Sequence, residues 1–148
     1  MLIINKEKKE IHMTRGDDVI IDIEPDDGYI FRTNDVVRFK VFEAKKPTNV
    51  VLHKDVKVAV ETPTVPVPLD KSITKIGDYI EKPVKYWYEV ELNPDTKPQT
   101  IIGYDLKGPK LFVLYPEGGD MTTMLTNDDS NELEDYDDDV YIYTGGEI

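Results

Sequence analysis

The chain has 148 residues, of which 39% are hydrophobic, and it carries a formal net charge of -12. This length allows one domain with an ordinary core, because a chain of this size buries about 70% of the surface that its unfolded form exposes. The sequence contains no cysteine, which excludes disulfides, thiolate metal sites and a cysteine nucleophile.

The negative charge is concentrated in the C-terminal quarter. Residues 1–110 hold all 18 Lys and Arg and 19 of the 30 acids, whereas residues 111–148 hold 11 acids and no base. A nearly neutral body has no basic face for phosphates, and an acidic segment is repelled by anionic lipids, so we expect neither nucleic acid nor membrane as a partner. The N-terminus lacks the apolar run of a signal peptide, and no stretch approaches the roughly 20 apolar residues that cross a bilayer. We therefore expect synthesis in the cytoplasm.

Apolar and polar residues alternate repeatedly along the chain, a pattern that predicts strands with one buried face. The predicted strands cover residues 19–24, 36–43, 50–54, 56–61, 85–93, 99–104 and 109–115. Prolines at 63, 66 and 68 favour an edge strand or an extended connector over residues 62–68. Residues 69–77 predict a single helical turn that ends at Gly77.

These short strands and the turn signals between them predict an all-β fold, an antiparallel β-sandwich of two sheets. We expect the sandwich domain to occupy residues 1–118 and residues 119–148 to form an acidic C-terminal extension with little to bury. One last alternation inside this extension predicts a terminal strand, which consists of Val140, Tyr141, Ile142 and Tyr143.

Few residues are available for catalysis, and we expect the protein not to be an enzyme. The only serines are Ser72 and Ser130 and the only histidines are His12 and His53, so a Ser-His-Asp triad would have to bring isolated residues together. The acids at positions 89 and 91 share one strand face beside the tryptophan at 87. That placement suits either a glycosidase-like or sugar-binding pair or a solvated strand face, and the solvated face is favoured.

Two further motifs are better explained without a binding function, the first as a solvated acidic tail and the second as a turn. The acidic run at residues 127–139 has ligand types that suit calcium, but it lacks the glycine that helix-loop-helix calcium sites require. Arg15, Gly16 and Asp17 spell the integrin-binding tripeptide, yet they come just before the predicted strand 19–24, where a turn is expected. We predict no metal site and no cofactor.

Residues 13–23, followed by residues 29–31 and 34–41, resemble the opening of small tail and baseplate proteins of phages and prophages of Gram-positive bacteria. In that pattern a Thr-Arg/Lys-Gly-Asp turn precedes one strand and a Gly-Asp turn precedes the next. Here Asn34 and Asp35 stand in place of the second Gly-Asp.

The stretches at residues 80–91, 100–103 and 112–118 are similar to the second half of the same module, so that the resemblance covers about residues 10–118. The family it resembles is the N-terminal domain of the upper baseplate protein. The resemblance implies an immunoglobulin-like sandwich, docked onto other proteins at the tail tip.

On this basis we expect a non-enzymatic structural protein of the virion, a tail or baseplate component that is a homo-oligomer in the assembled particle. The residues predicted to form interfaces are Trp87, Tyr86, Tyr88, Val140, Tyr141, Ile142 and Tyr143. Two alternatives stay open. One is a head decoration or head-fibre attachment protein, and the other is a carbohydrate-binding module that recognises a host surface glycan through Trp87 and nearby tyrosines.

Overall fold

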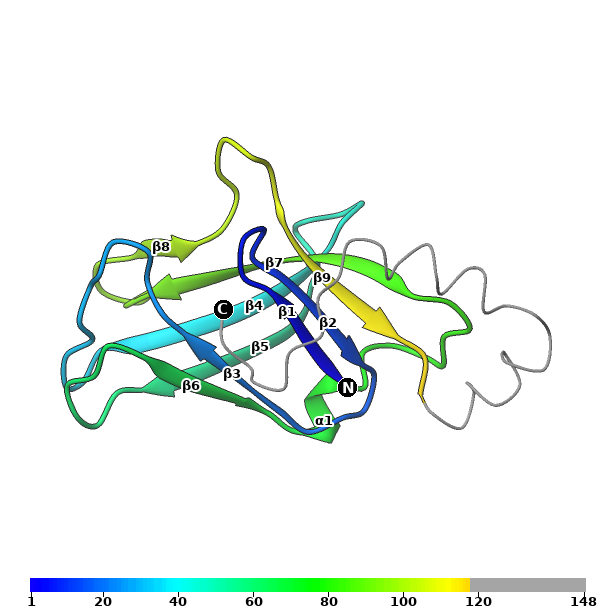
Figure 1. Ribbon diagram of the computed structural model, residues 1–148, viewed down its shortest axis with the longest axis horizontal. Helices are drawn as coiled ribbons and strands as arrows, with labels where there is room; N and C mark the ends of the chain where they lie inside the picture. Colours follow the sequence, from blue (N-terminus) through cyan, green and yellow to red (C-terminus); the bar gives the residue numbers. More distant parts are fainter. Residues whose placement is uncertain (118–148) are drawn as a thin grey trace.

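The computed structural model describes residues 1–117, and over these residues the fold is all-β, as predicted (Figure 1). The described residues form nine strands and one short helix. In chain order they are β1 (Leu2–Asn5), β2 (Glu10–Thr14), β3 (Val19–Ile23), β4 (Val36–Glu43), β5 (Val50–Lys57), β6 (Val65–Leu69), α1 (Lys71–Thr74), β7 (Val84–Leu92), β8 (Gln99–Ile102) and β9 (Lys110–Tyr115).

The strands form two sheets. The larger has the order β1-β2-β9-β7-β4-β5. β7 is long enough to pair with β9 along its first half and with β8 along its second half. β3 and β6 form a separate two-stranded sheet, in which they lie side by side (Figure 1). One pair departs from the antiparallel prediction, because β2 and β9 run parallel. A parallel pair needs a long crossover, which the whole intervening chain provides here.

A single hydrophobic core joins the two sheets. On β4 every second residue is buried, and the same alternation continues on β7 and on the small sheet. The core residues from these strands are Val37, Phe39, Val41, Tyr88, Val90, Leu92, Ile21, Ile23, Val65, Val67 and Leu69. Since buried side chains of both sheets belong to one cluster, the inner face of the small sheet packs onto the inner face of the large one.

Apart from shifts of a few residues at the ends of elements, the structure differs from the predicted elements in two respects. Residues 50–54 and 56–61 do not form two strands: β5 is continuous from Val50 to Lys57, because β4 pairs with it along its whole length with one irregularity near Phe42. The β1–β2 hairpin was not predicted at all. As expected, β6 is a proline-containing edge strand. α1 is a single turn, and the Asp70 carboxylate caps it by accepting hydrogen bonds from its first amides.

The predicted acidic extension and its terminal strand, made of Val140, Tyr141, Ile142 and Tyr143, lie outside the described residues. Within residues 1–117, no helix is both long enough and apolar enough to cross a membrane.

Candidate functional site

The outward-facing side of β4 and β7 is where the described residues gather charged and aromatic side chains. Lys40 lies opposite Glu89 and Phe42 lies opposite Trp87 in the antiparallel register of these strands. Because alternate side chains point to opposite sides of a sheet, these residues lie on the face opposite the core. We call this surface the outer face; its members on β4 and β7 are Arg38, Lys40, Phe42, Trp87, Glu89 and Glu91.

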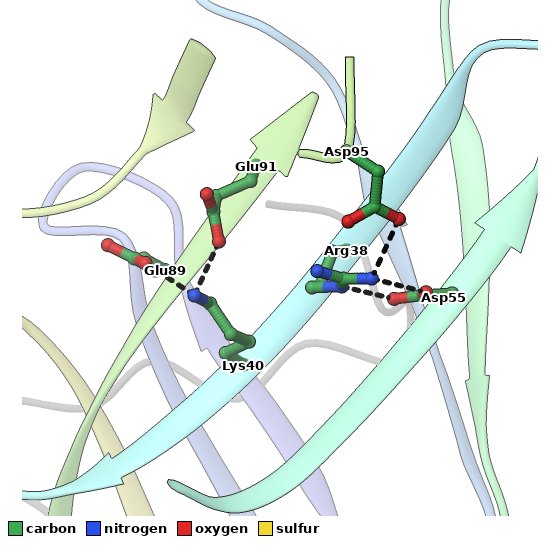
Figure 2. A network of polar contacts seen from close by, with 6 residues as sticks. All are labelled: Arg38, Lys40, Asp55, Glu89, Glu91 and Asp95. Atoms are coloured by element: carbon green, nitrogen blue, oxygen red, sulfur yellow. Dashed lines mark hydrogen bonds and ion pairs between the residues drawn. The ribbon is translucent and has the colours of Figure 1, made fainter. Parts of the chain in front are cut away.

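Two cations form ion pairs with four acids on the outer face (Figure 2). The Lys40 ammonium points between two carboxylates of β7, at 3.2 Å from Glu89 Oε1 and 2.5 Å from Glu91 Oε1. The other cation is Arg38, whose guanidinium places Nε and Nη2 at 2.8 and 2.9 Å from the two carboxylate oxygens of Asp55. Its Nη2 also lies 3.4 Å from Asp95. The carboxylates are therefore ion-paired across neighbouring strands.

The electrostatics of this network favour the charged form of each shifted group. Partial burial opposes the charge on Lys40, but the carboxylates of Glu91 and Glu89 outweigh it and raise the pKa of Lys40 above its usual value. The hydrogen bonds between Arg38 and Asp55 raise the pKa of the guanidinium and lower the pKa of the carboxyl. Glu89 and Glu91 share one ammonium, so the arrangement is an ion-pair ladder.

An aromatic pocket adjoins the ion-pair ladder. Trp87 is half-buried, and its ring meets the ring of Tyr104 edge-on, with centroids 6.0 Å apart. The Tyr104 side chain comes from the segment between β8 and β9 and is 71% exposed. The pocket has a volume of about 270 Å³, and its lining includes Phe42, Pro47, Trp87, Tyr104 and Pro109. Lys40 Nζ lies 5.5 Å from the centroid of the Phe42 ring, which links the pocket to the ladder.

The three aromatic residues predicted to form an interface are divided between the two faces of β7. Trp87 points outward, whereas Tyr88 is only 2% exposed and stacks on Phe39 in the core at a centroid distance of 5.5 Å. Tyr86 is half-buried and packs against the core. The other predicted interface residues, Val140, Tyr141, Ile142 and Tyr143, are outside the described part of the chain.

The sequence pattern does not indicate that Tyr104 belongs to this site. This tyrosine is the last residue of the predicted strand 99–104, whereas β8 ends at Ile102, and it reaches Trp87 only through the pairing of β7 with β8 and β9.

The Arg-Gly-Asp tripeptide forms a structural turn, as predicted. Gly16 has a positive φ of 84°, a conformation that glycine adopts without strain. Arg15 donates from Nε to the carbonyl of Ile76 at 3.1 Å and from Nη2 to the carbonyl of Gly77 at 2.5 Å. Asp17 is paired with the N-terminal amino group. Both charged side chains of the tripeptide are thus engaged within the fold.

The triad candidates have other partners. The buried His12 ring contacts the Tyr115 hydroxyl at 3.0 Å and a Glu10 carboxylate oxygen at 3.2 Å. Ser72 donates its hydroxyl to Asp70, the capping residue of α1. Nowhere in residues 1–117 do three His, Asp or Glu side chains come close enough together to hold a metal ion.

Comparison with protein-family models, with curated proteins and with solved structures finds no match to this chain.

Proposed function

We propose that this protein is a non-enzymatic structural component of a phage virion, a tail or baseplate protein whose immunoglobulin-like β-sandwich binds neighbouring virion proteins. The observation that carries the proposal is the strand order. It supports the sequence resemblance, which covers about residues 10–118 and points to the N-terminal domain of upper baseplate proteins, a family of immunoglobulin-like sandwiches.

The strand order agrees with that type of sandwich. Immunoglobulin-like domains pair their second and fifth core strands in one sheet and order the third, sixth and seventh side by side in the other. Here β3 pairs with β6, while β4, β7 and β9 are consecutive neighbours in the larger sheet, with β5 beside β4. The parallel β2–β9 pair at the other side of this sheet is compatible with the same arrangement.

The state of the carboxyl groups supports a structural role. An acid that donates a proton in catalysis needs a raised pKa. Where the pKa of a carboxyl in residues 1–117 is clearly shifted, the shift is downward, and the groups concerned are Glu10, Asp35, Asp55, Asp70 and Asp105. These acids stay ionised and act in ion pairs, turns and a helix cap.

Immunogold electron microscopy of purified phage particles tests the location. The native gene would carry a small epitope tag, and particles from an untagged strain would be the control. We expect gold at the tail tip. Label on the head would instead favour the decoration or fibre-attachment role, and particles without the tagged chain would contradict a virion role altogether.

A second candidate function is binding of a host surface glycan, and the aromatic pocket is the observation that favours it. Stacking on an exposed ring next to polar groups is a common way to hold a sugar, and Trp87 and Tyr104 lie beside Glu89 and Lys40. Purified host cell-wall polysaccharide is the probe, and titration calorimetry measures its affinity. Tyr104→Ala should weaken binding about tenfold, the effect of one aromatic contact of ~1.5 kcal/mol. Tyr79→Ala, at another exposed tyrosine, is the control and should change nothing.

A further inference from the structure

The register of the small sheet leaves one side of β3 open for pairing. Ile20 lies opposite Pro68, and Asp22 lies opposite Pro66. Proline has no N–H, so these must be the pairs that exchange no hydrogen bonds, and the ladder uses the alternate residues. Those residues on β3 are Val19, Ile21 and Ile23. The N–H and C=O groups of Ile20 and Asp22 therefore point away from β6, toward the free edge of β3.

This edge lacks the protection that two other edges have. On β6 the backbone groups of Pro66 and Pro68 face away from β3, toward the other edge of the small sheet. Proline has no N–H, so this edge offers no donor to an incoming strand at these two positions. On β5 the edge is guarded by ionisable side chains, a common defence against unwanted pairing; these are His53, Lys54, Asp55 and Lys57. On β3, by contrast, Ile20 is 56% exposed. Within residues 1–117, no backbone hydrogen bond from Ile20 or Asp22 to a third strand is present.

An open hollow lies at one end of this edge. It has a volume of about 580 Å³, and Met1, Leu2, Val19, Ile20 and Pro68 are among the residues that line it. Three acids, Asp17, Asp18 and Asp70, also line the hollow, and the N-terminal amino group, which is paired with Asp17, is the only cation among the lining residues, so the hollow carries a net negative charge. A strand that added here would place alternate side chains beside the apolar inner-face residues Ile21 and Ile23 and its other side chains beside Asp22.

We propose that β3 is the acceptor strand for an extended segment of another protein, in which apolar residues alternate with Lys or Arg. Main-chain hydrogen bonds to Ile20 and Asp22 would hold the segment, and the charge of Asp22 would select its basic residues. A second copy of β3 is a poor occupant, since it would bring the acids of both copies together. The chain's own residues 118–148 are equally poor, because they carry 10 acids and no base.

The test measures the hydrogen-exchange rates of individual backbone amides of the full chain by NMR. The probe is an acetylated and amidated Lys-Val-Lys-Val-Lys peptide, and the control is a Lys-Pro-Lys-Pro-Lys peptide, which has the same charge but cannot pair as a strand. At saturation one added backbone hydrogen bond should slow exchange of the Ile20 and Asp22 amides by about tenfold. The proline peptide should leave both amides unchanged.

A charge reversal on the edge provides the matched variant. Asp22→Lys should abolish the protection, whereas Glu7→Lys, the same charge change in the exposed turn between β1 and β2, should preserve it. The proposal is wrong if both peptides protect equally, or if the protected amides lie on β1 or β5. It is also wrong if sedimentation shows a dimer that protects the same amides without peptide. Should Asp22→Lys fail to fold, the comparison of the two peptides on the wild-type chain still decides.

Discussion

The hydroxyl of Tyr88 donates a hydrogen bond to the main-chain carbonyl of Lys9 at 2.5 Å, joining residues 79 positions apart in the sequence. Tyr88 lies at the centre of the large sheet, and Lys9 lies in the turn of the β1–β2 hairpin with a positive φ of 57°. Burial raises the pKa of the Tyr88 hydroxyl, so that it remains a donor. One buried side chain thus anchors the edge hairpin to the core.

Removing this hydroxyl should destabilise the fold without changing its packing. We expect Tyr88→Phe to lower the free energy of unfolding by about 1–2 kcal/mol, because the carbonyl of Lys9 loses a buried partner while the ring keeps its contact with Phe39. Urea denaturation followed by circular dichroism measures the change. Tyr104→Phe, at an exposed tyrosine, is the control and should match the wild type. Equal stability of Tyr88→Phe and the wild type would mean that the hydrogen bond contributes nothing.

Asp35 should make stability depend on pH in the acid range. Burial raises the pKa of its carboxyl, but hydrogen bonds from Arg32 N at 2.9 Å, Tyr29 Oη at 2.7 Å and Asn93 Nδ2 at 3.1 Å outweigh burial, and the net pKa is lowered. A lowered folded pKa gives stability that is fully present above the unfolded pKa of about 3.9 and is lost as pH falls through the folded pKa.

Asp35→Asn tests this dependence. The side-chain amide that the substitution introduces has only one acceptor oxygen, and its NH₂ group would face one of the three groups that donate to the Asp35 carboxylate. We therefore expect the variant to lose about 1–3 kcal/mol of unfolding free energy at neutral pH. Below the folded pKa the wild-type carboxyl is protonated as well, and the difference between the two proteins should shrink. Urea unfolding of both proteins across the acid range measures it. A difference that stays constant with pH would show that the charge of Asp35 is not responsible.

The ion-pair ladder on the outer face should respond to the loss of its shared cation. Lys40→Met leaves Glu89 and Glu91 close together without their counter-ion, and we expect a loss of about 1 kcal/mol, the usual upper range for a partly exposed pair. Adding Glu89→Gln and Glu91→Gln to Lys40→Met removes the repulsion and should restore most of this stability. If the triple variant is no more stable than Lys40→Met, repulsion between the two acids is not the cause.

Most of the strands were predictable, because a strand with one buried face alternates apolar and polar residues in its sequence. β4 and β7 show this pattern clearly, and their predicted bounds differ from the structure by at most one residue. The first hairpin was missed because the consecutive apolar residues of β1 do not alternate. The division of residues 50–61 was wrong for another reason. After Lys57 the chain leaves the sheet, and Val58 pairs with the turn residue Asp35 instead, a contact that no local pattern encodes.

The candidate site was predictable only in part. The shared face of Trp87, Glu89 and Glu91 follows from a period of two along one strand. Their partners do not, because Lys40 and Phe42 reach them through the register between β4 and β7. Register depends on pairing of segments far apart in the sequence, so the ion pairs and the aromatic pocket become visible only in the folded chain.

The Arg15 side chain should matter for its shape as well as its charge. Its guanidinium reaches the carbonyls of Ile76 and Gly77 and the carboxylate of Glu117, which fastens the segment after α1 to the turn after β2. A lysine ammonium is a point charge on a flexible stem and cannot reproduce this fork of donors. We therefore expect Arg15→Lys to lower the free energy of unfolding by about 1–3 kcal/mol, the range for hydrogen bonds to a charged group.

Arg32→Lys, at an exposed arginine, is the matched control and should remain within about 0.5 kcal/mol of the wild type. Hydrogen exchange adds a local readout, since loosening of the segment after α1 should speed exchange of amides near Ile76 in Arg15→Lys but not in Arg32→Lys. If Arg15→Lys were as stable as the control, charge alone would suffice at this position. The tripeptide would then be less tied to the fold than its hydrogen bonds indicate, because a side chain that tolerates the loss of its donor geometry can turn toward a partner.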